Sequence, residues 1–199
     1  MFVIVEQIAL GWSPSADRFT WMMENIPVWI GGIAIALTWR KFPLSNLCLA
    51  LLAVHSLILA VGGHYTYAKV PLGDWVRDAL HLSRNHYDRL GHLAQGFIPA
   101  ILVREVLMRK LTLRGPVVAL LSIACCLAFS AFYELVEWWT AVLKGEGASA
   151  FLGTQGDVWD TQWDMFLALI GSSAAMLLLP KLHDRSMAKL PAPAKTARV

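Results

Sequence analysis

The chain has 199 residues, of which 57% are hydrophobic and 16% charged, and its formal net charge is +3. Soluble domains are about 45–50% apolar and about 25% charged, so this composition excludes an ordinary soluble domain and indicates an integral membrane protein. The positive charge is too small and too scattered for a nucleic-acid-binding surface. We therefore expect the lipid bilayer, and no nucleic acid, as a partner.

Five apolar stretches reach or approach the roughly 20 residues that a helix needs to cross a bilayer. Gly- and Pro-containing motifs separate them, such as RKFP, KVPLGD, RGP and KGEG. The sequence therefore predicts an all-α, polytopic membrane helix bundle that forms one domain over residues 1–180. Its full transmembrane helices are expected at about 24–39, 44–63, 86–108, 116–141 and 162–180.

The two ends of the chain differ from these spans. The N-terminal MFVIVEQIALGW is apolar but too short to cross a bilayer, and it lacks the basic region that opens a signal peptide. We expect it to form a short or partial hydrophobic segment. Residues 181–199 are polar and contain PAPAK, a composition that favours a disordered tail.

Lysine and arginine gather in alternate connections between the predicted helices. They are Arg40 and Lys41, then Arg109, Lys110 and Arg114, then Lys181, Arg185, Lys189, Lys195 and Arg198. Connections rich in Lys and Arg stay on the cytoplasmic side of a membrane. The sequence thus predicts a multi-pass protein of the bacterial inner membrane with a cytoplasmic C-terminus and the connections 64–85 and 142–161 outside.

Ionisable side chains gather at the predicted outer ends of three helices. Residues four apart, or three apart, share one face of a helix, and at about 1.5 Å per residue all of them lie within roughly 10 Å of one surface. The predicted ligand set comprises Asp88, His92, Glu134, Glu137, Asp160 and Asp164.

Carboxylates brought together repel one another unless a cation shares the site. Arg77, Arg84 and Arg89 are candidate counter-charges, and one divalent metal ion is the other candidate. Oxygen ligands with an imidazole suit Mg²⁺, Mn²⁺, Ca²⁺ or Zn²⁺. Glu137 or His64 would then be the catalytic general base toward a metal-bound water.

A structural explanation competes with this one. Asp88, Asp160 and Asp164 lie near predicted helix N-termini, where the helix dipole stabilises negative charge without any ligand. The same dipole is unfavourable for Glu134 and Glu137, which lie near the C-terminal end of their helix. Those two glutamates are the stronger reason to predict a site.

Three segments carry a family resemblance: RNHYDRLGHLAQGFIPAILVRE, SAFYELVEWW and FLGTQGDVWDTQWDM. The chain resembles the YjdF-like family of bacterial inner-membrane proteins, which implies a class of protein and no chemistry. It has a weaker similarity to VanZ-like membrane proteins, associated with glycopeptide resistance, in the order of DRLGH, YELVEW and DTQWDMFLALIG. That analogy implies that six residues occupy positions of the VanZ-like pattern: His92, Glu134, Glu137, Asp160, Asp164 and Gly171. This chain has more carboxylates at these positions, which favours a cation over an anionic ligand.

Three functions fit these residues, and the sequence leaves open whether the protein is an enzyme. The first is a metal-dependent hydrolase or transferase acting on a lipid or lipid-linked envelope substrate. The second is a protein that binds or transports a cation or small ligand, although few polar residues beyond His55 and Ser130 continue toward the cytoplasm. The third is a structural or accessory membrane protein without catalysis.

Overall fold

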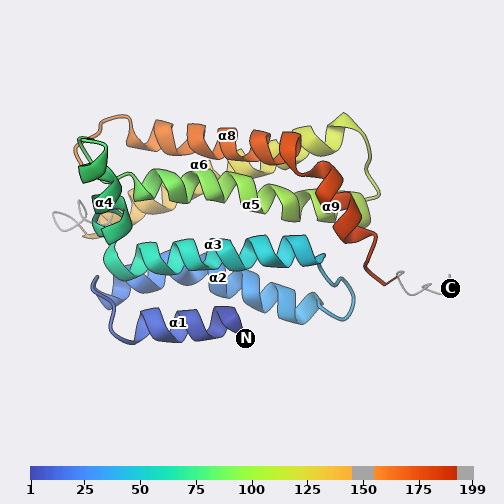
Figure 1. Ribbon diagram of the computed structural model, residues 1–199, viewed down its shortest axis with the longest axis horizontal. Helices are drawn as coiled ribbons and strands as arrows, with labels where there is room; N and C mark the ends of the chain where they lie inside the picture. Colours follow the sequence, from blue (N-terminus) through green and yellow to red (C-terminus); the bar gives the residue numbers. More distant parts are fainter. Residues whose placement is uncertain (145–154, 192–199) are drawn as a thin grey trace.

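The structure, a computed structural model, describes residues 1–144 and 155–191, and within these ranges it contains helices and no strand. The all-α prediction is confirmed. Figure 1 shows α1 (Phe2–Trp12), α2 (Arg18–Thr38), α3 (Asn46–Tyr65), η1 (Tyr67–Lys69), α4 (Pro71–Ala79), α5 (Tyr87–Arg109), α6 (Pro116–Lys144), α8 (Asp160–Leu178) and α9 (Pro180–Met187).

The long helices run side by side, while the short α4 lies at one end of the bundle and α9 bends away at the other (Figure 1). Helices α5, α6 and α8 pack against one another, α1 and α2 pack on α3, and α3 joins the two groups by packing on α5. The short helix α1 confirms the predicted partial N-terminal segment. We call the end that contains α4 the acidic end and the end that contains α9 the basic end.

Glycines set the close approach of α5 and α8. A Cβ added at Gly96 would lie 2.0 Å from the Ala168 carbonyl oxygen, and one added at Gly171 would lie 2.1 Å from the Leu93 carbonyl oxygen. Only a residue without a side chain fits at either place, as is common where membrane helices meet. This contact brings the first turns of α5 and α8 together at the acidic end.

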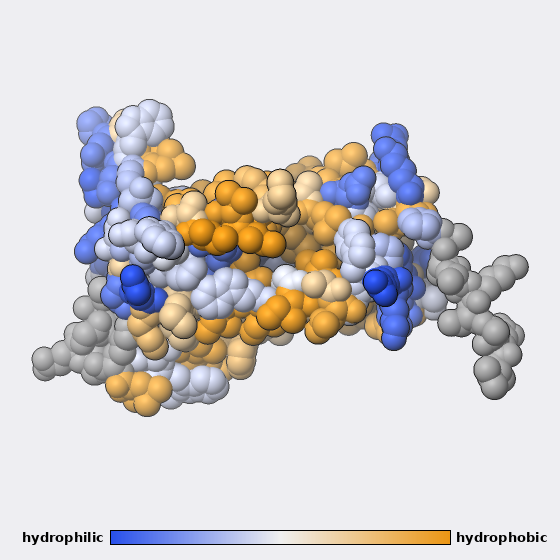
Figure 2. Space-filling model, turned by 90° about the horizontal axis from the view of Figure 1, so that it is seen from below, coloured by the Kyte–Doolittle hydropathy of each residue, from blue (hydrophilic) through white to orange (hydrophobic). Residues whose placement is uncertain are grey.

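Apolar side chains form a band between two hydrophilic ends (Figure 2). Within the described residues, α3, α5 and α6 are each long and apolar enough to cross a membrane, and α8 with α9 is a fourth candidate, bent by 65°. Helix α2 is not among them, because Glu24 and Asn25 lower the hydropathy of its first half. A multi-pass helical protein is thus established, whereas the predicted number of five full spans is not.

The structure differs from the predicted disordered tail. Pro180 begins α9, which extends to Met187, and His183 within it is fully buried. Proline is favoured in the first turn of a helix, and the buried His183 joins α9 to α5 by its contact with Glu105. The prediction of disorder for residues 181–187, which rested on polar composition alone, was therefore wrong. Residues 192–199 lie outside the described part of the chain.

Candidate functional site

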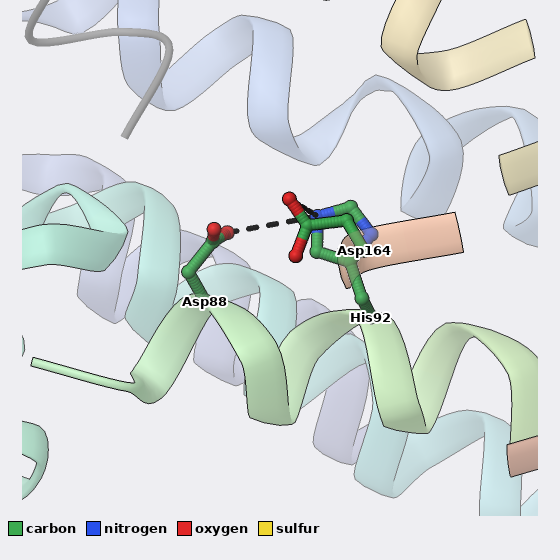
Figure 3. A group of neighbouring side chains, drawn as sticks. All are labelled: Asp88, His92 and Asp164. Atoms are coloured by element: carbon green, nitrogen blue, oxygen red, sulfur yellow. Dashed lines mark ion pairs between the residues drawn. The ribbon is translucent and has the colours of Figure 1, made fainter. Parts of the chain in front are cut away.

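Three helices place four of the predicted ligands in one buried group at the acidic end. His92 Nε2 lies 3.7 Å from Asp88 Oδ1 and 3.8 Å from Asp164 Oδ2, so the ring of α5 lies between a carboxylate of its own helix and one of α8 (Figure 3). On the other side of the ring, Nδ1 lies 3.9 Å from Glu134 Oε1 of α6. Helical spacing places Asp88 and His92 on one face of α5, and the packing of α5 against α6 and α8 brings Glu134 and Asp164 beside them.

The distances suit a shared cation. Asp88, His92 and Asp164 each offer one ligand atom, and these atoms lie within 4.8 Å of one another; His92, Glu134 and Glu137 form a second such group. Metal–ligand bonds of about 2.0–2.5 Å place neighbouring ligand atoms at comparable separations. We call these five residues the acidic cluster.

A hydrogen bond fixes which histidine nitrogen faces which partner. His92 Nδ1 lies 3.0 Å from Gln95 Oε1, one turn further along α5. The amide oxygen accepts, so Nδ1 carries a proton, and in the neutral ring Nε2 presents its lone pair between Asp88 and Asp164. Metal-binding histidines in proteins are held in this way, by a second hydrogen bond from the nitrogen that does not bind the metal.

Two carboxylate oxygens of the acidic cluster lack donors. Asp164 Oδ1 and Glu134 Oε1 are buried without a hydrogen-bond partner among the described residues, and their side chains are only 4% and 7% exposed. A buried carboxylate without donors is costly in free energy. A cation among these oxygens would remove that cost.

Asp160, predicted as a metal ligand, pairs with Arg84, one of the predicted counter-charges. Arg84 NH1 lies 2.7 Å from Asp160 Oδ1 and 3.5 Å from Asp157 Oδ2, and Arg89 NH2 lies 2.8 Å from Asp157 Oδ2. Two of the predicted counter-charges are therefore present, and they neutralise the outermost carboxylates rather than the acidic cluster. Arg77 pairs with aspartates of its own helix α4.

His64, the second candidate base, is not brought to the acidic cluster. Its Nδ1 lies 2.7 Å from the Leu10 carbonyl oxygen and its Nε2 lies 3.4 Å from Ser15 Oγ. His55 lies nine residues earlier on α3, about 180° around the helix, and it lines the cavity beside His92. His64 therefore faces α1.

Sequence reasoning missed Glu24. This glutamate of α2 is 6% exposed and accepts a hydrogen bond of 3.1 Å from the Tyr133 hydroxyl of α6. A Cβ added at Gly63 would lie 2.9 Å from Glu24 Cβ, so the glycine lets α3 approach α2 there. Glycines commonly mark places where membrane helices approach closely, but nothing in the sequence indicates which helix meets Gly63.

A cavity of about 50 Å³ lies next to the acidic cluster, between α2, α3, α5 and α6. Its polar part is formed by Glu24, Tyr67, Asp88, His92, Tyr133 and Glu137, and its apolar part includes Pro27, Leu59 and Phe129. This is room for a few water-sized groups. The acidic cluster is thus accessible to a small ligand and its water.

Comparisons with known proteins agree with the predicted class. The family described as "Predicted membrane protein (DUF2238)" matches residues 1–185. The "Inner membrane protein YjdF" of Escherichia coli (strain K12) is 50% identical over 172 residues, which cover 86% of this chain and 82% of that protein. No solved structure matches significantly. The similarity to VanZ-like proteins stays a prediction, and the chain belongs to the DUF2238 family of membrane proteins, which confirms the YjdF-like resemblance.

Proposed function

We propose that Asp88, His92 and Asp164 hold one divalent metal ion, and that the protein is a metal-dependent hydrolase or transferase acting on a lipid or lipid-linked envelope substrate. The observation that carries the proposal is the position of His92. Its Nε2 lies 3.7–3.8 Å from two carboxylates while Gln95 holds Nδ1. Two carboxylates and a neutral imidazole leave coordination positions for water and substrate.

The proposed chemistry assigns a role to each nearby group. A divalent ion held there would make a bound water acidic enough to lose a proton near neutral pH, and it would polarise a substrate oxygen. Glu137 lines the cavity and is the general base that accepts the proton of that water. In hydrolysis the water oxygen would bond to the acyl carbon or phosphorus while the bond from that atom to the leaving oxygen breaks, and Glu137 would return the proton to the leaving oxygen.

The depth of the site supports a lipid substrate. Asp88 follows the first residue of α5, and Asp164 lies in the second turn of α8. At about 1.5 Å per residue, both side chains lie within roughly 10 Å of the acidic end, the depth of lipid headgroups rather than of the bilayer centre.

The interior beyond the site disfavours transport. Ala100 and Ile101, further along α5, are fully buried and belong to an apolar core with Cys126 and Met176. This core separates the acidic cluster from the polar residues at the basic end. A site closed on that side suits an enzyme or a binding protein better than a permeation path.

Metal analysis of the purified protein in detergent tests the proposal. We expect a stoichiometric divalent ion in the wild type, its loss in Asp164→Asn, and its retention in Asp78→Asn, whose side chain is 70% exposed on α4. Equal metal content in all three proteins would contradict the proposal, since an ion at the His92 site requires Asp164.

A further inference from the structure

The cavity beside the acidic cluster is lined by more acidic than basic side chains. Glu24, Asp88 and Glu137 line it, and no Lys or Arg is among the described residues that do so. Arg84 and Arg89 lie against aspartates that do not line the cavity. An ion held by Asp88 and Asp164 would leave Glu24 and Glu137 facing the remaining space, which therefore attracts a cationic group.

Aromatic side chains accompany these carboxylates. Tyr67 and Tyr133 line the same cavity, and Gly91 and Gly62 make room for the Tyr67 ring, since an added Cβ would meet it at 3.0 and 2.5 Å respectively. Carboxylates combined with aromatic faces are the surroundings in which proteins bind ammonium groups.

The apolar part of the cavity lies deeper in the bundle. Pro27 follows Glu24 by about one turn along α2, and Phe129 precedes Glu137 by about two turns along α6, which runs toward the acidic end. Phe129 is 45% exposed, so this part of the wall is open to the surrounding lipid. A headgroup at the carboxylates and a chain along the apolar residues would match the orientation of a bilayer lipid.

We propose that the cavity binds an aminolipid, with its ammonium group beside Glu24 and the start of its alkyl chain along Pro27, Leu59 and Phe129. This inference names the substrate class of the proposed metal site and rests on that function for the reaction. The contacts themselves are independent of the metal, since neither Glu24 nor the apolar residues belong to the His92, Asp88 and Asp164 group.

The test compares two lipids that share a phosphate and differ in the ammonium group. The full chain is placed in nanodiscs with equimolar phosphatidylethanolamine and phosphatidylglycerol of identical acyl chains, and the lipids retained after release are counted by native mass spectrometry. We expect a several-fold excess of phosphatidylethanolamine on the wild type. Glu24→Gln should bring the ratio toward that of the bulk.

A matched pair of variants tests the chain-binding part. Phe129→Trp should reduce the amount of retained lipid, whereas Phe132→Trp should not, because Phe132 is similarly exposed on α6, at 52%, but does not line the cavity. Equal losses in the two variants would overturn the assignment of the chain to this wall.

Metal analysis of the same samples separates the two proposals. A wild type that keeps its ion but retains phosphatidylglycerol as well as phosphatidylethanolamine, or retains neither, would overturn the aminolipid inference alone. A preference for phosphatidylethanolamine in a protein without bound metal would support the inference and overturn the proposed metal-dependent function.

Discussion

Two buried polar groups lie on α5, one near each end, and they differ in how completely their atoms are paired. At the basic end, Glu105 Oε2 lies 2.9 Å from His183 Nε2, and Glu105 Oε1 accepts hydrogen bonds from Ser45 N at 2.9 Å and Arg109 NH1 at 2.5 Å. Arg104 NH1 lies 2.9 Å from His183 Nδ1. We call these five residues the clasp.

The acidic cluster differs from the clasp because some of its buried polar atoms are unpaired. Three of its carboxylates lie 3.7–3.9 Å from His92, and Asp164 Oδ1 and Glu134 Oε1 have no hydrogen-bond partner among the described residues. A fully paired buried network holds helices together, whereas an incompletely paired one is costly unless a ligand completes it. The clasp therefore suits a structural role, and the acidic cluster suits the metal site that we propose.

The largest expected effect is in the clasp. Glu105→Ala would leave Arg109 and His183 without their shared carboxylate, and breaking a buried ion pair in this way costs about 3–5 kcal/mol of the free energy of unfolding. Thermal unfolding in detergent measures it. A variant as stable as the wild type would show that the clasp does not hold α9 in place.

A smaller effect is expected when metal is removed. Binding to the folded state at 100 times Kd stabilises by about 2.7 kcal/mol, so a chelator should lower the unfolding temperature of the wild type. Asp164→Asn removes one of the proposed ligands, so this variant should bind no ion. Its unfolding temperature should therefore be the same with and without the chelator. The same response in both proteins would place the chelated ion elsewhere.

The approach of α5 and α8 should be sensitive to a single methyl group. Gly171→Ala would push against the Leu93 carbonyl oxygen, and overpacking of this kind costs about 1–3 kcal/mol. Metal affinity should also fall, because Asp164 lies on the displaced helix. Gly32→Ala is the control, since an added Cβ there meets nothing within 4 Å.

The smallest effect is expected at His64. His64→Gln would disturb the contact with the Leu10 carbonyl oxygen, which is worth about 1 kcal/mol, and should leave the metal content unchanged. Loss of the ion in this variant would show that His64 belongs to the metal site. It would contradict the placement of His64 on the face of α3 that points away from the acidic cluster.

The sequence predicted those features that depend on spacing within one helix. Asp88 and His92 share a face of α5 whatever surrounds them, and the glutamates of α6 share another. The pairing of Asp160 with Arg84 and the direction of His64 depend on how helices rotate against one another, which periodicity does not determine. Glu24 was missed for the same reason, because only the fold places α2 beside α6.

The α9 helix shows a second limit. Its residues are polar, and a polar composition ordinarily favours a disordered segment. The buried contact between His183 and Glu105 joins residues 78 positions apart in the chain. Composition describes a segment by itself, and this helix is stabilised by a distant partner.

The most direct test of the binding site is a titration of the metal-free protein with Mn²⁺, followed by electron paramagnetic resonance, for the wild type and Asp164→Asn. Our account predicts one tight site in the wild type, with nitrogen coupling from His92, and no such site in the variant. Tight binding of equal strength in both proteins, or in neither, would contradict it and leave the acidic cluster without a role as a metal centre.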